Sequence, residues 1–387
     1  MLTKKLNANR AQHLTRARMV CESRRAQHIG EDQRSYINFT SNDYLGLATD
    51  PRVKKAMIDG INQYGVGSGS SPVVSGYYQS TRALEEQFAD FLKRDRAVLF
   101  NSGYHANCGL FSAIADRHTS IIADKFLHAS LLDGIRLSRA KLCRFQHHHA
   151  QHASQLLEKN WGALFVTESV SSMSGEICPL PEYLPATKKY QAITVLDDAH
   201  GIGILGELGA GGCDQFNLQQ SDIHFLITPL AKALGTMGAL VSGSHAAIES
   251  LIQFARTYHY SSALPPAIPV ATLAALKILQ TENWRRDQLK SLIQHFIREA
   301  KNRNLPLTSD DLTPIKSIII GGNAATSRLV SDLRDHHFLV ACIRPPTVPN
   351  NTARIRISLN CMQKESDITA LLDFISRRYH HAFKACS

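Results

Sequence analysis

One lysine near the middle of the chain has a sequence context that suits a nucleophile. The apolar run Phe225–Ile227 is broken by Thr228-Pro229, and Lys232 then stands between two alanines. A short apolar run that ends at a proline is typical of a buried strand followed by a turn. An amine just beyond such a strand can lose its hydration, which favours the uncharged form that attacks carbonyl carbons. The plainer alternative is a lysine that opens the next helix.

A second polar group follows another apolar run. Ile193–Leu196 leads into Asp197, and His200 comes shortly after it. An aspartate at a buried strand end can pair with a protonated ring nitrogen, and a nearby histidine can reach a phenolic oxygen on the same ring. Lysine, aspartate and histidine together suit an aldehyde cofactor such as pyridoxal phosphate (PLP), which needs an amine and a carboxylate. Taken alone, Asp197 is better explained as a helix cap, as His128 is by a satisfied core histidine and Gly103 by a turn.

Other apolar runs also end in polar residues. Ser102 follows Ala97–Phe100, His128 follows Ile121–Ala123, and Glu168 follows Leu164–Val166. Short apolar strands separated by helical segments indicate a mostly parallel sheet covered on both faces. Because ligands bind beyond the carboxyl ends of such strands, we expect these polar residues to share one site.

The pattern changes after about residue 265. A long helical stretch over roughly 267–303 precedes the strand 315–320, a further helix and the alternating strand 353–359. Alternation in the last strand puts Ile355 and Ile357 on one face and two arginines on the other. The sequence therefore predicts an α/β protein with a helical N-terminal segment (1–40), a large domain (41–270) and a smaller C-terminal α+β domain (271–387).

Composition limits the possible function classes. The chain has 387 residues, 44% of them hydrophobic, which suffices for two buried cores. The 8 cysteines are scattered without a Cys-x-x-Cys pair, which argues against a disulfide scaffold or zinc module and for a reducing cytosol. The longest apolar candidate, 263–279, contains three prolines, so we expect no membrane span.

The charge distribution favours small acidic partners over nucleic acid. The net charge is +10, and no acidic residue precedes Glu22. The basic N-terminus lacks the apolar core of a secretory signal, so we expect an amphipathic helix, with a transit peptide as the alternative. Lysine and arginine neither form a dense block nor alternate with aromatic residues, which argues against nucleic acid. Coenzyme A and acidic acyl carrier protein remain compatible partners.

Several stretches of the chain resemble the α-oxoamine synthase family of PLP-dependent enzymes, from about residue 35 to 375. The matching stretches are Asn38–Leu47, Val74–Tyr77, Asn101–Asn107, Leu127–Leu132, Val195–Gly203 and Ile343–Pro349. The last is particular to the biotin-pathway branch of the family, and the others are shared among its members.

The resemblance implies a PLP-dependent transferase of fold type I, a cytoplasmic homodimer with shared active sites. The implied reaction is the decarboxylative condensation of L-alanine with a pimeloyl thioester, either pimeloyl-CoA or pimeloyl acyl carrier protein. The alternatives are a relative that uses glycine, serine or another acyl-CoA, or a catalytically impaired homologue that serves for binding.

The resemblance also implies roles for four residues at the cofactor ring. Lys232 forms a Schiff base with the pyridoxal 5'-phosphate aldehyde and later moves the α-proton. Asp197 pairs with the pyridine nitrogen, and His200 with the phenolic oxygen. His128 stacks on the ring.

Further residues are implied to bind the phosphate and the substrates. The phosphate is held by the amides of Gly103 and Tyr104, the Ser172 hydroxyl, and a hydroxyl at Ser262 from the partner subunit. For the substrates, the residues are Asn42 and Arg356 at the amino-acid carboxylate, Arg16 at the distal pimeloyl carboxylate, and Arg344 at the acyl product.

Three positions depart from the family pattern. Pro229 stands where relatives have a phosphate-binding threonine, and it has no side-chain donor. Thr228 is the candidate replacement, although a shift of one residue on a strand turns its side chain to the other face. Ala231 replaces a usual glycine, and Ser174 stands where many relatives have aspartate. We expect these changes to weaken cofactor affinity.

Two other motifs compete for a functional interpretation. Gly201–Gly206 fits the G-x-G-x-x-G motif that follows a strand in nicotinamide-binding proteins. However, residues 197–200 separate the strand from the first glycine, and further glycines at 209, 211 and 212 indicate a loop where that motif needs a helix. The run His147–His149, with His152, is a candidate metal site. It lacks cysteines or carboxylates at ligand spacing, so we expect no metal.

Overall fold

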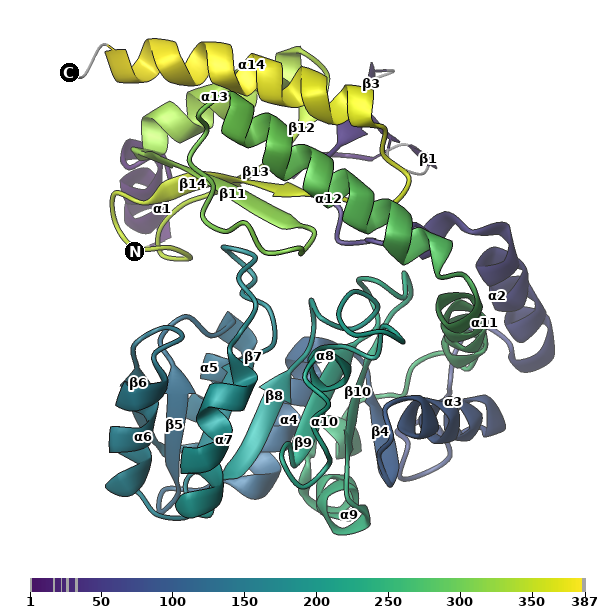
Figure 1. Cartoon of the computed structure of the whole chain (residues 1–387). Coiled ribbons are helices and arrows are strands. Elements are labelled where there is room, and N and C mark those ends of the chain that lie inside the picture. Colours follow the sequence, from purple (N-terminus) through teal and green to yellow (C-terminus); the bar gives the residue numbers. More distant parts are fainter. Residues whose placement is uncertain (1, 17, 22, 26–27, 32–33, 385–387) are drawn as a thin grey trace. The chain divides into compact units, whose positions relative to one another are not determined.

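The computed structural model describes residues 2–16, 18–21, 23–25, 28–31 and 34–384. The chain divides into two compact units (Figure 1). The large unit comprises residues 50–171 and 177–283, and the small unit comprises 1–49, 172–176 and 284–387. Each unit is built around its own sheet or sheets.

The large unit contains a seven-stranded sheet among its described residues, in the order β4-β10-β9-β8-β7-β5-β6. Strands β9, β8, β7, β5 and β6 run parallel, whereas β10 is antiparallel to both of its neighbours. The strands are β4 (Arg96–Phe100), β5 (Ser120–Asp124), β6 (Lys141–Phe145), β7 (Leu164–Glu168), β8 (Ile193–Asp197), β9 (Phe225–Pro229) and β10 (Ala239–Gly243). The predicted, mostly parallel sheet is confirmed.

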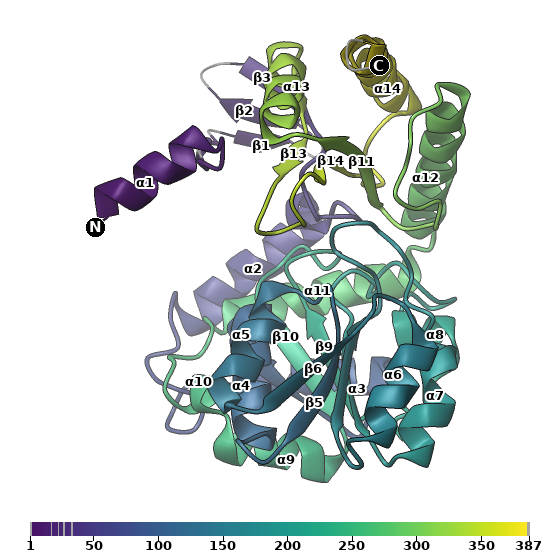
Figure 2. The ribbon, with the colours of Figure 1, turned by 90° about the vertical axis from the view of Figure 1, so that its left-hand side faces the viewer.

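Helices cover both faces of this sheet, as Figure 2 shows for α4 and α5 on one side and α6 and α7 on the other. The helices of the large unit are α2 (Pro51–Tyr64), α3 (Gln79–Phe91), α4 (Gly103–Ile114), α5 (Ala129–Ser138), α6 (Ala150–Glu158), α7 (Leu180–Lys189), α8 (Gly212–Gln215), α9 (His245–Phe254), α10 (Arg256–His259) and α11 (Ala267–Thr281).

Burial explains why the central strands are almost continuously apolar. On one face, side chains of β4, β5 and β9 pack against α4, α5 and α9 in a single core cluster. On the other face, Phe145 stacks on Phe165 with ring centroids 5.5 Å apart, and Tyr183 of α7 lies 5.0 Å from Phe165. Because the central strands are buried on both faces, their charged residues, such as Glu168 and Asp197, lie at the strand ends, where the functional side chains collect.

The small unit contains two sheets among its described residues, β1-β2-β3-β12 and β11-β14-β13. Its strands are β1 (Ser23–Arg25), β2 (His28–Glu31), β3 (Arg34–Asn38), β11 (Ile315–Gly321), β12 (Phe338–Leu339), β13 (Ala341–Ile343) and β14 (Ala353–Ser358). Its helices are α1 (Leu2–Ala11), the 3₁₀ turn η1 (Leu47–Thr49), α12 (Trp284–Asn302), α13 (Asn323–Asp335) and α14 (Glu365–Lys384). The predicted α+β character of this unit is confirmed.

The N-terminal segment differs from the predicted helical segment 1–40. Among the described residues of this segment, Leu2–Ala11 is the helical part, and β3 pairs in parallel with β12, with Ile37 opposite Phe338. Helix α1 does not bury an apolar face over its described side chains, because residues 3–11 are all exposed and Leu6 itself is 57% exposed. The segment therefore belongs to the small unit through strand pairing across the length of the chain.

The predicted boundary at residue 270 lies inside α11, whereas the chain divides between Asn283 and Trp284. The predicted long helix over 267–303 is two helices, α11 and α12, separated at Glu282 and Asn283. Helix α11 packs on α2 and α3 of the large unit, and α12 packs on α14 of the small unit. Both are apolar on one side, so periodicity alone did not reveal the break.

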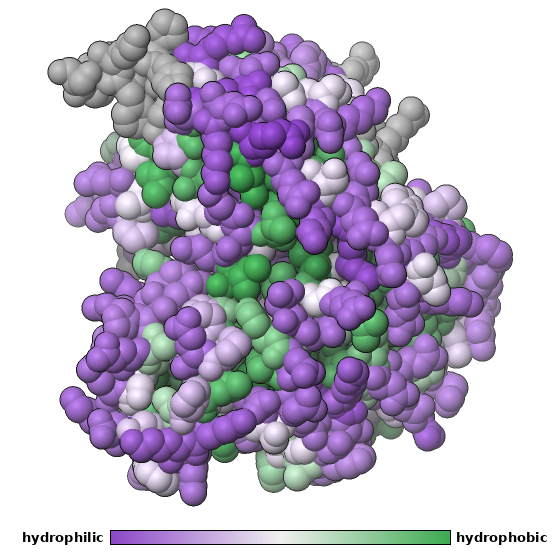
Figure 3. Space-filling view, viewed as in Figure 1, coloured by the Kyte–Doolittle hydropathy of each residue, from purple (hydrophilic) through white to green (hydrophobic). Residues whose placement is uncertain are grey.

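The surface is consistent with the composition. Over α6 and α7, the face seen in Figure 3 is largely hydrophilic. Among the described helices, none has the length and hydropathy needed to cross a bilayer. The described cysteines are unpaired thiols, and several of them are buried.

Candidate active site

Three of the predicted residues lie at the carboxyl edge of the central sheet. Asp197 is the last residue of β8, His200 lies in the turn after it, and Lys232 lies in the turn after β9. Lys232 Nζ is 3.0 Å from His200 Nε2, a hydrogen-bonding distance. A protonated Lys232 donates to His200 Nε2, so the imidazole fixes the position of the amine.

Asp197 is buried and held at both carboxylate oxygens. It is 5% exposed, and Oδ1 accepts the Ala199 N–H at 3.1 Å. Oδ2 accepts a hydrogen bond from Asn107 Nδ2 at 3.2 Å. Donors on both oxygens stabilise the charged carboxylate in a place where burial alone would oppose it. Asn107 was not among the predicted site residues.

His128 follows β5 and caps helix α5. Its Nδ1 lies 2.7 Å from Ser130 Oγ and also accepts the Ser130 N–H at 3.3 Å. Although the residue as a whole is exposed, this edge of the ring faces the buried Ser130. Loss of hydration lowers the pKa of His128; Asp197 opposes this effect and Lys232 adds to it. Hydrogen bonds through Asn107 and Ser130 connect His128 to Asp197.

Glu168, at the end of β7, supports the same loop. Its Oε1 accepts the main-chain N–H of His128. Burial, with Asp197 close by, raises the pKa of Glu168 to about 8. The sequence predicted that Glu168 lies at the shared edge but gave it no role. In the structure, Glu168 holds the main chain of His128 in place.

The N-terminus of α4 provides amides for an anion. Helix α4 begins at Gly103, and Ser102 caps it by accepting the His105 N–H at 3.2 Å. The amides of Gly103 and Tyr104 are in the first turn, where N–H groups have no partner within the helix. A Cβ on Gly103 would lie 3.1 Å from Pro229 Cγ, so the glycine lets the helix end approach β9 closely.

The other predicted phosphate ligands are placed differently. Pro229 faces α4, so alternation along β9 turns Thr228 to the opposite face. Thr228 Oγ1 is buried and has no hydrogen-bond partner among the described residues. Its orientation argues against Thr228 as the replacement donor. Ser262 is exposed, with its carbonyl accepting from Asn101 Nδ2, and Ser172 is buried in the small unit.

The small unit brings Asn42 and Arg356 together, as predicted. Arg356 Nη2 donates to Asn42 Oδ1 at 3.2 Å, and the Tyr44 hydroxyl donates to the same oxygen. Arg356 is 7% exposed, and its Nε has no acceptor among the described residues. A buried guanidinium with an unused donor is suited to an anionic ligand such as a carboxylate. Burial raises the pKa of Tyr44 to about 12, so Tyr44 remains a neutral donor.

Arg344 contacts the N-terminal segment. Its guanidinium donates to the carbonyls of His13 and Thr15 and to Ser327 Oγ. The exposed Arg16 is the next residue of that segment. The contacts of Arg344 therefore hold the backbone that carries Arg16, a relationship that the sequence did not reveal.

The glycine-rich segment after Asp197 is a loop around a carboxylate. Residues 201–210 form turns, and the next helix begins only at Gly212. The Gly212 N–H donates to both oxygens of the buried Asp198, at 3.2 and 3.1 Å. A Cβ on Gly201 or Gly211 would lie 2.0 or 1.7 Å from an Asp198 oxygen. The glycines make room for Asp198, which accounts for them without a nicotinamide site.

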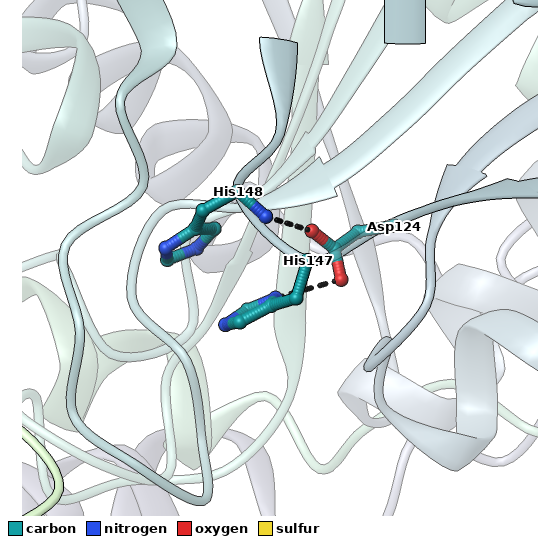
Figure 4. Close-up of side chains that lie close together, drawn as sticks. All are labelled: Asp124, His147 and His148. Carbon is teal, nitrogen blue, oxygen red and sulfur yellow. Dashed lines mark hydrogen bonds and ion pairs between the residues drawn. The ribbon is translucent and has the colours of Figure 1, made fainter. Parts of the chain in front are cut away.

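The histidine run lies beside Asp124 at the end of β5 (Figure 4). His147 Nδ1 is 2.8 Å from Asp124 Oδ1, and the His148 N–H donates to Oδ2 at 3.2 Å. The two imidazole rings stack with centroids 3.8 Å apart, while His149 caps α6. Each Asp124 carboxylate oxygen thus accepts a hydrogen bond from the turn at residues 147–148. These contacts give the cluster a structural role, which is to stabilise this loop.

The residues of the large unit suit PLP. The helix N-terminus at Gly103 offers amides for its phosphate, the buried Asp197 offers a charged acceptor for its ring nitrogen, and Lys232 offers an amine. His128 presents an exposed ring beside these groups. The donor and acceptor types match the cofactor at its phosphate, ring and aldehyde.

Comparison with known proteins agrees with this geometry. The chain is 42% identical over 370 residues to 8-amino-7-oxononanoate synthase of Nitrosococcus oceani, covering 95% of this chain and 98% of that protein. The solved 8-amino-7-oxononanoate synthase of Francisella tularensis is 36% identical, with a TM-score of 0.80 over 90% of this chain and 99% of its own. A solved serine palmitoyltransferase that contains PLP as an internal aldimine is 25% identical, with a TM-score of 0.90 over 98% of this chain and 96% of its own.

Residues 34–375 match the aminotransferase class I and II family, which accounts for most of the chain. Together with the fold type I architecture of the large unit, this match identifies the chain as a member of the aminotransferase class I and II family.

Proposed function

We propose that this protein catalyses the PLP-dependent condensation of L-alanine with a pimeloyl thioester, releasing carbon dioxide, free thiol and 8-amino-7-oxononanoate for biotin synthesis. The observation that carries the proposal is the group at the carboxyl edge of the sheet, where Lys232 Nζ is 3.0 Å from His200 Nε2 and Asp197 ends the adjacent strand. The names and the near full-length coverage of the relatives support the choice of reaction.

When bound, PLP supplies an aldehyde that binds amines and a pyridinium ring that accepts the electrons of a carbanion. The protein supplies the groups that hold it and move protons. Asp197 provides the negative charge that keeps the ring nitrogen protonated. Two hydrogen bonds fix its carboxylate, so it does not have to reorganise during the reaction.

Lys232 has two tasks in the proposed reaction. Its amine would hold the cofactor at the aldehyde carbon, and the same amine, once free, would take the α-proton of alanine. His200, 3.0 Å away, keeps the amine oriented and can accept a hydrogen bond from its ammonium form. General acid–base catalysis by a positioned group contributes about 10²–10⁴-fold to a rate.

The three anionic groups of the cofactor and the substrates have suitable donors. The α4 amides at Gly103 and Tyr104 would hold the cofactor phosphate. In the small unit, Arg356 and Asn42 form a carboxylate-binding group, with the unused Nε of Arg356 as the donor for the amino acid. Arg16 is proposed to bind the distal carboxylate of the pimeloyl chain, and Arg344 to hold Arg16 in place.

The assembly and the carrier are also proposals. A homodimer would bring the partner's hydroxyl at Ser262 to the phosphate, consistent with the exposure of Ser262 in the single chain. The pimeloyl group would arrive on coenzyme A or on an acidic carrier protein, and the net charge of +10 suits either. A reducing cytosol is the expected compartment because the described cysteines are free thiols.

The test is a product assay with purified protein. The protein is incubated with PLP, L-alanine and pimeloyl-CoA, and the product mass is determined. Parallel reactions replace alanine by glycine or serine and pimeloyl-CoA by palmitoyl-CoA. We expect 8-amino-7-oxononanoate only with alanine and the pimeloyl donor. A product formed preferentially with serine or palmitoyl-CoA would assign a different reaction within the same chemistry.

A further inference from the structure

Asn107 connects two residues of the candidate site. It lies on α4, is almost fully buried, and its Nδ2 has two partners: Asp197 Oδ2 at 3.2 Å and Ser130 Oγ at 2.8 Å. Ser130 Oγ in turn lies 2.7 Å from His128 Nδ1. A continuous hydrogen-bonded chain therefore runs from Asp197 through Asn107 and Ser130 to His128.

The direction of each hydrogen bond follows from the chemistry of the groups. Asp197 carries two acceptor oxygens, so the Asn107 atom facing it must be the NH₂ group. That group has two hydrogens, and its second hydrogen goes to Ser130 Oγ. The Ser130 hydroxyl must then donate its single proton onward, and His128 Nδ1 is the acceptor at 2.7 Å. His128 Nδ1 is consequently unprotonated, and the ring proton lies on Nε2.

This orientation of the Asn107 amide leaves one of its polar atoms without a hydrogen bond. Asn107 Oδ1 is buried and has no hydrogen-bond partner among the described residues. An unsatisfied buried carbonyl is unfavourable, and its presence indicates that the two donor contacts of Nδ2 outweigh it.

Close helix packing makes the chain of contacts possible. A Cβ on Gly134 of α5 would lie 2.6 Å from the Asn107 carbonyl oxygen. Only a residue without a side chain lets α5 approach α4 closely enough for Ser130 to reach Asn107.

We propose that Asn107 is a positioning residue that controls two groups at once. It holds Asp197 as a charged acceptor, and through Ser130 it holds His128 as the neutral Nε2–H imidazole. The proposal extends the proposed function and rests on it for its catalytic meaning. A neutral imidazole can stack on a cationic pyridinium, whereas an imidazolium would repel it. One amide would thus secure both the charge at the ring nitrogen and the neutrality of the stacking ring.

The surroundings of His128 act in both directions. Loss of hydration lowers the pKa of His128 most and Lys232 adds to this effect, whereas Asp197 and Asp133 oppose it. These influences do not determine which ring nitrogen carries the proton. A directed hydrogen bond to Nδ1 makes that choice and supports the neutral ring.

The first test uses the wild-type protein without cofactor. Long-range ¹H–¹⁵N NMR spectra of ¹⁵N-histidine-labelled protein at neutral pH report which ring nitrogen carries the proton, and His128→Asn identifies the signal. We expect an unprotonated Nδ1 and a protonated Nε2. A proton on Nδ1, in either the other tautomer or the imidazolium, would overturn the proposal without bearing on the reaction catalysed.

The second test separates positioning from packing. Asn107→Asp preserves shape but replaces the donor by an acceptor, so the Ser130 hydroxyl turns toward residue 107 and His128 Nδ1 keeps only the longer hydrogen bond from the Ser130 N–H. We expect a shifted His128 Nδ1 signal and a PLP dissociation constant raised about tenfold or more, because Asp197 loses a charge-assisted hydrogen bond and gains a like charge. Asn107→Leu, which removes the donor without adding charge, should have the smaller effect on His128.

Two controls complete the design. Ser130→Ala breaks the link to His128 but leaves the contact of Asn107 with Asp197, so the imidazole signal should change more than the PLP affinity. Asn217→Asp adds the same charge at an exposed position and should change neither. If Asn107→Asp and Asn107→Leu both left the His128 signal as in the wild type, while lowering only thermal stability, Asn107 would be a packing residue and the proposal would be wrong.

Discussion

The carboxyl group of Glu168 is hydrogen-bonded to the main chain of His128: Glu168 Oε1 accepts the His128 N–H. A side chain at the end of one strand therefore fixes the loop after the neighbouring strand, with β5 and β7 paired in parallel. The contact joins a buried acid to the residue proposed to cover the cofactor.

Glu168 should make stability depend on pH. Burial raises its pKa from 4.5 to about 8, so between these values the folded protein keeps a proton that the unfolded chain releases. The stabilisation from this group is complete below pH 4.5 and is lost as the pH rises to about 8, at roughly 1.4 kcal/mol per pH unit. Glu168→Gln keeps an acceptor for His128 and should flatten the profile of urea unfolding free energy. Glu86→Gln, at an exposed position, should leave the wild-type slope.

Lys232 should be the point of cofactor attachment. Lys232→Ala should lower turnover by at least about 10²-fold, because both the amine and the proton carrier are lost. Borohydride reduction followed by peptide mapping should locate the label at Lys232 in the wild type. Lys277→Ala, at an exposed position of α11, should retain label and turnover. A reduced adduct on any other lysine would contradict the assignment.

Pro229 should limit cofactor affinity. Pro229 faces Gly103 at the helix N-terminus but has no donor, so Pro229→Thr should add a hydrogen bond to the phosphate and tighten PLP binding about tenfold. Equilibrium titration of apoprotein measures this. Thr228→Val provides the comparison, because Thr228 faces away from Gly103 and its loss should leave affinity unchanged. Weakened binding in Thr228→Val would restore Thr228 as a phosphate ligand.

Gly134 should be intolerant of a side chain. A Cβ would lie 2.6 Å from the Asn107 carbonyl oxygen and 3.0 Å from Phe111 Cδ2, so Gly134→Ala must push α5 from α4. Overpacking of this kind costs about 1–3 kcal/mol, which a urea-unfolding curve resolves. Gly67→Ala, where a Cβ meets no atom within 4 Å, should be close to neutral. Equal stability of the two variants would mean that the helices have room to adjust.

Arg344 should hold the N-terminal segment. Arg344→Ala removes the guanidinium and its hydrogen bonds to the His13 and Thr15 carbonyls. Because the segment is then held less firmly, trypsin should cut after Arg16 about tenfold faster. If Arg16 binds the acyl donor, the KM for pimeloyl-CoA should rise while the KM for alanine stays constant. Arg328→Ala, an exposed arginine of α13, is the matched control. Unchanged cleavage would show that the segment is held by other contacts.

The sequence predicted the central sheet and much of the site because both leave local signals. Strands such as β8 are buried apolar runs, and polar residues such as Asp197 mark their ends. Asn107 was missed even though it carries a weak signal. It is a polar residue within a helix whose neighbours Ala106, Leu110 and Phe111 are apolar and buried. Its partners come from α5 and β8, and no local pattern contains that information.

Features that depend on distant pairing were predicted poorly. The segment 1–40 was predicted to be helical, but β3 pairs with β12 and joins the small unit. The break between α11 and α12 was missed because both helices present apolar faces on either side of Glu282. In both cases the structure depends on partners far along the chain, to which helical periodicity is insensitive.

The parallel pairing of Ile37 with Phe338 has a consequence for synthesis on the ribosome. At about 5–20 residues per second, the early strand emerges some tens of seconds before its partner exists. Residues 50–171 and 177–283, by contrast, are complete well before the C-terminus is made. The large unit can therefore mature co-translationally, while β3, although it is synthesised before that unit, is among the last elements to reach its final position.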